Sequence, residues 1–177
     1  MGSIINVKQP EFNLRSRLNE LDYDRIPYEK MPLGTVIQHV YNEVKGGGHL
    51  TTTSSSWADM SFSVSITPHF SNSLILVEMS ALGQQPNTHN SVSAATIYRN
   101  NTTNIGDTAN SNFGLSCVGD FGASTYVTSP QTFFVYDEPK TTNETSYHLW
   151  GRTSNSGTAY ITHSGVTRTL SVKEIRR

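Results

Sequence analysis

The sequence predicts an all-β fold, an antiparallel β-sandwich of jelly-roll type that follows a short N-terminal arm containing one helix. From residue 34 onward, apolar and polar residues alternate with the period of two that strands require. Clusters of Gly, Pro, Asn, Asp and Ser separate the alternating segments, and no long helical period interrupts them. The first 30 residues differ from the rest, because they carry five basic and five acidic residues.

This change of composition assigns residues 1–32 to an N-terminal attachment arm and residues 33–177 to the β-sandwich domain. Residues 10–21 predict a short helix, because the leucines at 14, 18 and 21 fall on one helical face and Pro10 suits a first turn. The prolines at 27 and 32 predict an extended segment over residues 23–32. The arm side chains expected to bind a partner are Phe12, Leu14, Leu18, Leu21, Ile26, Tyr28 and Met31. A helix of about twelve residues is marginal alone, so its leucines need a surface, either on their own domain or on another subunit.

About ten strands are expected in the domain. Residues 62–66 predict a half-buried strand, since Phe62, Val64 and Ile66 alternate with serines. The continuous apolar run of residues 74–79 is typical of a central strand. The other expected strands cover residues 36–44, 95–100, 103–106, 124–127, 131–137, 145–152, 157–163 and 167–175. Strands without crossover helices favour two packed sheets.

Charge and hydropathy argue against several classes of partner. The net charge is −1 and the pI about 6.6, which favours neither nucleic acid nor an anionic membrane surface. No segment has the 18 to 20 apolar residues of a membrane span, and the N-terminus lacks the pattern of a secretory signal. We therefore expect a protein that is made in the cytoplasm and used without passing through a secretion pathway.

Few residues suggest catalysis or metal binding. The adjacent carboxylates Asp137 and Glu138 predict a solvated turn, because neighbouring strand residues face opposite sides. The six histidines are widely spaced, and His148 is the first candidate for a metal ligand on a symmetry axis, although a surface role is favoured. Cys117, the single cysteine, is expected to be a buried thiol. The sequence thus predicts no enzyme activity, no cofactor and no metal.

The aromatic residues mostly alternate within expected strands, which predicts core packing or cross-strand pairing. They are Phe62, Phe133, Phe134, Tyr136, Tyr147 and Trp150. Trp57 lies in loop-like sequence and is a candidate surface contact.

Several segments together resemble a β-sandwich module of tailed-phage virion proteins, especially those of cyanobacterial and marine phages. They are residues 33–38, 51–56, 62–68, 71–77, 97–100, 103–106 and 170–175. The resemblance covers residues 33–177; it departs from the module at Leu74, where a lysine is usual, and in a hairpin lengthened by residues 100–104. It implies a role as a capsid decoration (cement) protein or a distal fibre domain, commonly trimeric, and implies nothing about the arm.

Three functions from different classes follow. The first is a capsid decoration protein that clamps major capsid subunits through its arm and displays the sandwich outward. The second is a tail-fibre module that binds a receptor or a host-surface glycan, and the third is a carbohydrate-active enzyme, disfavoured because paired carboxylates are missing. A short arm and one head favour the first. We also expect a homotrimer, since threefold packing would cover exposed sheet edges.

Overall fold

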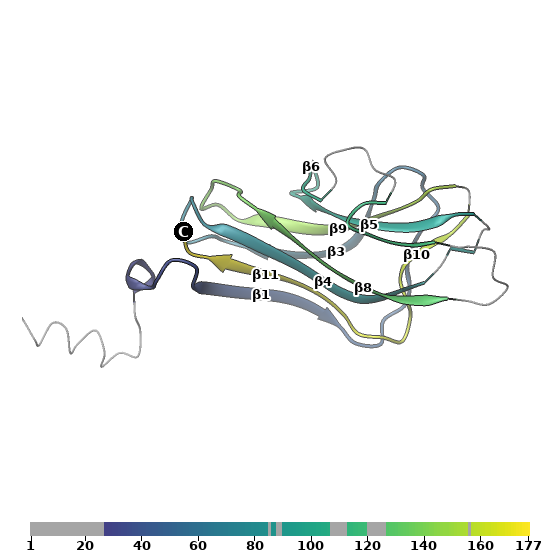
Figure 1. The fold of residues 1–177 in the computed structure, drawn as a ribbon, viewed down its shortest axis with the longest axis horizontal. Helices are drawn as coiled ribbons and strands as arrows, with labels where there is room; N and C mark the ends of the chain where they lie inside the picture. Colours follow the sequence, from purple (N-terminus) through teal and green to yellow (C-terminus); the bar gives the residue numbers. More distant parts are fainter. Residues whose placement is uncertain (1–26, 85, 88–89, 107–112, 120–126, 156) are drawn as a thin grey trace, which may run out of the picture. The chain divides into compact units, whose positions relative to one another are not determined.

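The structure, a computed structural model, describes residues 27–84, 86–87, 90–106, 113–119, 127–155 and 157–177. The chain divides into two units, residues 1–32 and 33–177. A 3₁₀ turn, η1, covers Tyr28–Lys30. The strands among the described residues are β1 (Val36–Val44), β2 (Leu50–Thr52), β3 (Ala58–Ile66), β4 (Leu74–Gln84), β5 (Val92–Arg99), β6 (Thr103–Asn104), β7 (Ser116–Gly119), β8 (Thr128–Asp137), β9 (Thr145–Thr153), β10 (Ala159–Thr162) and β11 (Arg168–Ile175) (Figure 1).

The second unit is a sandwich of two sheets, and the named strands of the described part all pair antiparallel. The six-stranded sheet has β1, β11, β4 and β8 side by side, with β10 and β2 continuing from β4. The five-stranded sheet has β3, β9 and β5, flanked by β6 and β7. The orders β1-β11-β4-β8 and β3-β9-β5-β7 are those of a jelly roll. The predicted fold class is confirmed.

Alternation along the strands produces the core between the sheets. On β3 the even-numbered residues from Met60 to Ile66 are buried, whereas Ser61 and Ser65 are exposed. The prediction that residues 74–79 form a central strand is confirmed, because β4 pairs with β11 on one side and β8 on the other. The buried cluster comprises Met60, Phe62, Val64, Ile66, Ile75, Val77, Met79, Ala95, Ile97, Phe133, Tyr147, Leu149, Ala159, Ile161, Leu170 and Val172. Each fully buried branched aliphatic side chain contributes roughly 1.5–3 kcal/mol.

The alternation of apolar and polar residues did not predict the shortest strands. β2 and β7 contain only three and four residues, fewer than a period-of-two pattern needs to stand out. β6 is shorter than the segment 103–106 expected there. Most of the expected strand 124–127 falls outside the described residues, and residue 127 is not in a strand.

A buried carboxylate joins the end of β11 to the turn between β3 and β4. Glu174 is 0% exposed. It accepts hydrogen bonds from Ser73 Oγ at 2.6 Å and from the backbone N–H groups of His69 at 2.8 Å and Phe70 at 3.2 Å. Nδ1 of the His69 ring lies 2.9 Å from its second oxygen. These donors compensate the cost of burying the charge.

A second buried carboxylate connects the two sheets. Arg99 Nη1 on β5 donates to both oxygens of Asp137, at 2.8 and 3.0 Å, and the Tyr147 hydroxyl on β9 donates to Asp137 at 2.9 Å. The expected solvated turn is therefore wrong for Asp137, whose side chain is only 9% exposed. Asp137 ends β8 facing inward, where a distant arginine pairs its charge. Burial, and then the Asp137 charge, hold the pKa of Tyr147 well above its ordinary value, so the hydroxyl stays a donor.

The described part of the arm corrects the expectation of an extended segment over residues 23–32. Residues 28–30 form a turn, with Lys30 N–H donating to Pro27 O at 2.8 Å and Met31 N–H to Tyr28 O at 3.2 Å. Pro27 and Met31 themselves have extended dihedral angles. A proline presets φ for either conformation, which is why the sequence did not separate them. The helix expected over residues 10–21 lies outside the described residues.

We predict that Glu174→Gln lowers the free energy of unfolding by about 2–4 kcal/mol, because charge-assisted hydrogen bonds are lost and an amide N–H then faces donors. Burial alone raises the pKa of Glu174, but the bonds from Ser73, the His69 ring and two backbone N–H groups outweigh it and lower that pKa. A lowered folded-state pKa gives stability that is present above the ordinary value of 4.5 and is lost as pH falls through the folded value.

Urea unfolding of the wild type and of Glu174→Gln between pH 3 and pH 7 measures both effects. The difference between the two proteins should shrink below pH 4.5. The control is Glu138→Gln, whose exposed pair with Arg177 should contribute under about 1 kcal/mol. Equal loss in both variants at pH 7 would contradict the anchoring role of Glu174.

Candidate interaction surface

Strand β8 is an edge strand that exposes large aromatic side chains. It pairs with β4 over Thr128–Asp137 without a register shift, and with no other strand of the described part. Its residues 128–136 carry no charge. Phe134 is 63% and Tyr136 52% exposed, and their rings meet edge to face with centroids 6.0 Å apart. An uncharged edge strand with exposed aromatic residues is a template for association.

This exposure corrects part of the prediction for the aromatic residues. Phe133 and Tyr147 are buried as expected, whereas Phe134 and Tyr136 point to solvent. Both faces of this strand carry apolar residues, so alternation alone did not show which face the core takes. In the sequence, the residue that indicates an edge strand is Pro130, because proline lacks an N–H and is tolerated mainly at sheet edges.

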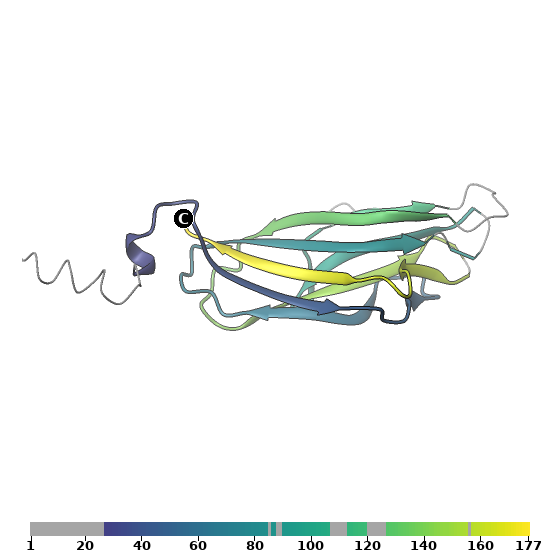
Figure 2. The ribbon, with the colours of Figure 1, turned by 90° about the horizontal axis from the view of Figure 1, so that it is seen from below.

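The outer face of the six-stranded sheet continues from β8 across β4 and β11 to β1, which lie side by side in Figure 2. The pairing registers arrange its outward side chains in rows. The rows are Phe134, Glu78, Ser171 and Tyr41; then Tyr136, Leu76, Lys173 and His39; then Leu74, Ile175 and Val36. In the centre, Lys173 Nζ lies 2.5 Å from Glu78 Oε2, so the two charges offset each other within these three rows. The next row carries the exposed carboxylate of Glu43 at its β1 end.

The opposite edge of this face also exposes apolar groups. β1 pairs only with β11 among the described strands. Tyr41 is 62% and Val36 48% exposed, and the Tyr41 ring lies 5.8 Å from that of His39. Exposed large apolar residues therefore occur on both edge strands of one sheet.

The outer face of the five-stranded sheet has a different character. Ser63 and Ser65 of β3 lie beside β9, and Trp150 of β9 stacks on Tyr98 of β5 with centroids 4.0 Å apart. The Trp150 indole N–H donates to Asn101 Oδ1 at 3.0 Å. This face is polar around one half-buried aromatic pair.

His148 lies on the same face, between a carboxylate and a hydroxyl. Its Nε2 is 2.9 Å from Ser146 Oγ, and its Nδ1 is 3.6 Å from Asp59 Oδ2. The order of groups is that of a hydrolytic triad, but 3.6 Å exceeds a hydrogen bond, and Ser146 Oγ also lies 3.3 Å from Asn100 Oδ1. The described residues contain no group of three His, Cys, Asp or Glu side chains placed to hold a metal ion.

Trp57, the candidate surface contact, is half-buried. The Arg152 guanidinium lies 5.6 Å from its ring centroid, and its ring edge packs against Gly114, where any side chain would collide with it. The expectation that Cys117 is a buried thiol is wrong, because the side chain of Cys117 is exposed. It lies on the short edge strand β7, where its neighbour Val118 takes the inward position.

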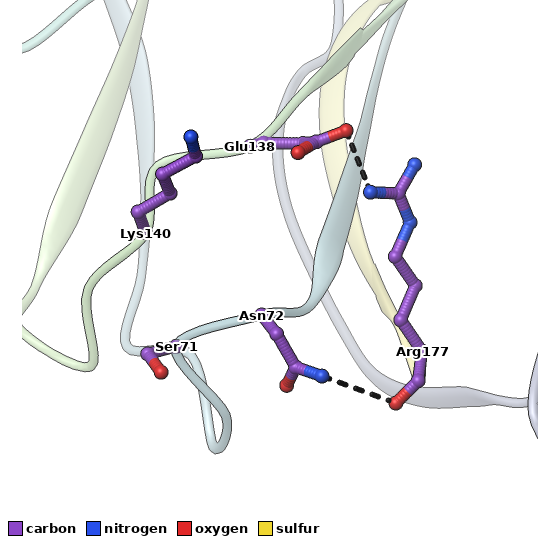
Figure 3. Close-up of a pocket in the computed structure, with 5 residues that line it drawn as sticks. All are labelled: Ser71, Asn72, Glu138, Lys140 and Arg177. Atoms are coloured by element: carbon purple, nitrogen blue, oxygen red, sulfur yellow. Dashed lines mark hydrogen bonds and ion pairs between the residues drawn. The ribbon is translucent and has the colours of Figure 1, made fainter.

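A shallow polar pocket lies at one end of the sandwich (Figure 3), lined by Ser71, Asn72, Glu138, Lys140 and Arg177. Glu138 and Arg177 point toward one another and pair at 2.6 Å, while Asn72 Nδ2 donates to the Arg177 carbonyl at 3.4 Å. Most of these groups are exposed and already paired with each other, so the pocket is not a preformed site for a small ligand.

Most of the predicted arm contacts cannot be placed in this surface. Phe12, Leu14, Leu18, Leu21 and Ile26 lie outside the described residues. Of the others, Tyr28 is exposed and Met31 half-buried. Within the described part of the chain, no helix has the length and hydropathy needed to cross a bilayer.

Comparisons with known proteins give likenesses in fold. No family model matches the sequence, and no curated protein matches it. A chain of the T13 viral particle of infectious bursal disease virus (IBDV) is similar over 86% of this chain and 35% of its own, with 18% identity and a TM-score of 0.45. A mutant VP2 protein of the same virus, in derived T=1 particles, is similar over 85% of this chain and 40% of its own, with 16% identity and a TM-score of 0.42.

We predict that chelators leave the melting temperature unchanged, since His148 has one carboxylate near it and no third ligand among the described residues. Thermal unfolding with and without an excess of EDTA measures this. A fall of many degrees would show a structural metal, with His148 at a symmetry axis as the first residue to replace.

Proposed function

We propose that this chain is a non-enzymatic structural protein of a phage virion, a decoration protein that attaches to capsid subunits through its arm and displays the sandwich outward. The observation that carries the proposal is the uncharged outer edge of β8 with Phe134 and Tyr136 exposed. Such a surface suits lasting contact with protein, whereas the pocket lined by Ser71, Asn72, Glu138, Lys140 and Arg177 is open to solvent.

The resemblance of the sequence to the phage module supports the same proposal. The segments that resemble the phage module fall on strands β1, β2, β3, β4, β5, β6 and β11 and on the turns beside them. These residues build the sandwich. A sandwich whose edge strands β1 and β8 expose apolar side chains suits assembly into a particle. Fold alone does not decide function, so the proposal depends on this surface and on the arm.

The arm is the proposed attachment device. Its three leucines would each contribute roughly 1.5–3 kcal/mol if a capsid surface buried them fully. Its ten charges are balanced, so they would set the register of docking and add little affinity.

A second candidate function, a tail-fibre module that binds a host-surface glycan, is favoured by one observation. The stacked pair Trp150–Tyr98 lies among Asn101, His148 and Asp59, and an aromatic face beside hydrogen-bonding groups suits a sugar ring. Locating the chain in a density map of the whole particle separates the two: capsid sites support decoration, and tail sites support the fibre module.

We predict that deleting residues 1–30 leaves the sandwich folded and abolishes its addition to particles that lack the protein. The domain has its own core, so the β circular-dichroism spectrum should persist. A full-length variant with Leu14, Leu18 and Leu21 replaced by Ala should lose most binding, whereas its matched control, with Arg17 and Glu20 replaced by Ala, should keep it. Normal addition of the truncated chain would show that the sandwich itself makes the contact.

A further inference from the structure

We propose that copies of this chain join head to tail, with β8 of one copy pairing antiparallel with β1 of the next. The partner is thus a second copy of the chain, and the two six-stranded sheets continue into one another. The inference rests on strand geometry and does not depend on the proposed function.

The first argument is the location of the exposed apolar residues. Phe134 and Tyr136 lie on β8, while Tyr41 and Val36 lie on β1, and these strands are the two opposite edges of β1-β11-β4-β8. A contact between two β8 strands would cover only one of these edges. A contact between β8 and β1 covers both.

The second argument is strand direction. β1 pairs antiparallel with β11, β11 with β4, and β4 with β8. β8 therefore runs opposite to β1, so a second copy in the same orientation places its β1 antiparallel to β8. Antiparallel pairing across such an edge needs no rearrangement of either sheet.

The third argument is register. Phe134 and Tyr41 belong to one row of the sheet, and Tyr136 and His39 belong to the next. If the rows continue across the junction, Phe134 lies beside Tyr41 of the next copy and Tyr136 beside its His39. Both pairs satisfy a single antiparallel register, and aromatic cross-strand pairs stabilise such contacts.

The edges of the five-stranded sheet differ in the ways that prevent pairing. β6 and β7 have two and four residues, and β3 has a bulge between Asp59 and Ser63 and exposed serines. Short edges and bulges are the usual protection against association. β8 has neither, its Pro130 lies four residues before Phe134, and the bulge of β1 lies at its start, before the residues that would pair.

Head-to-tail contact has a consequence for stoichiometry. A dimer with one such junction leaves one β8 and one β1 unpaired, so the contact repeats until a ring closes or a filament forms. The expected homotrimer is the smallest such ring.

The test uses sedimentation of the full chain and of two variants, Phe134→Lys and Tyr41→Lys. The wild type should have the mass of three or more chains, and each variant alone the mass of one. An equimolar mixture of the variants should give dimers, because one unaltered β8 and one unaltered β1 remain to form a single junction. Ser65→Lys, on the exposed outer face of the other sheet, is the matched control and should keep the wild-type mass.

Disulfide trapping tests the register in a Cys117→Ser background. Chains with both Phe134→Cys and Tyr41→Cys should form interchain disulfides, since paired residues in neighbouring strands lie within disulfide range. Chains with Phe134→Cys alone should not. A monomeric wild type, a wild-type dimer, failure of the mixed variants to associate, or efficient crosslinking through Phe134→Cys alone would each overturn the proposal.

Discussion

Burying a carboxylate in the apolar interior between the sheets requires donors that enter with it, and the domain meets this constraint at Glu174 and Asp137. Glu174 and Asp137 flank Ile75 of β4 from its two sides. Glu174 receives donors from the turn between β3 and β4, and Asp137 receives them from Arg99 and Tyr147 of the other sheet. Loss of one partner would leave an uncompensated buried charge, which is strongly destabilising. These contacts tie the end turn and both sheets to β4, and β4 in turn positions β8.

A jelly roll packs two sheets without closing either into a barrel, so the fold itself creates edge strands. In this chain the edge strands of the two sheets differ in length, regularity and exposed side chains. The five-stranded sheet ends in very short strands and a bulged, serine-rich one. The six-stranded sheet also has a short edge in β2, but its long edge strands β1 and β8 expose Tyr41 and Phe134. Because both belong to the same outer face, the unprotected edges are a property of one sheet and not of the fold as a whole.

The sequence was sufficient for the fold class and for the long strands, since the period of two is visible in Phe62, Val64 and Ile66 and in the run that became β4. It was not sufficient for orientation at the edges. The strand containing Phe133 and Phe134 is apolar on both faces, and only the pairing partners show which face is covered. Asp137 was placed in a turn because its partner Arg99 is 38 positions away along the chain, beyond any local pattern. The exposed thiol of Cys117 was missed for another reason, because β7 has only four residues and is too short to display its alternation.

The two outer faces of a sandwich point in opposite directions, and this separates the activities that the domain can support. Pairing through β8 and β1 would occupy the edges of the six-stranded sheet and leave the outer face of the five-stranded sheet open, with Trp150, Tyr98 and His148 at its centre. Gly34 and Thr35, which precede β1, are bonded to the residue that follows β11, since Gly34 N–H donates to Arg176 O and Arg176 N–H to Thr35 O. Self-association, as we propose it, would therefore leave the polar outer face of the five-stranded sheet free to meet another partner.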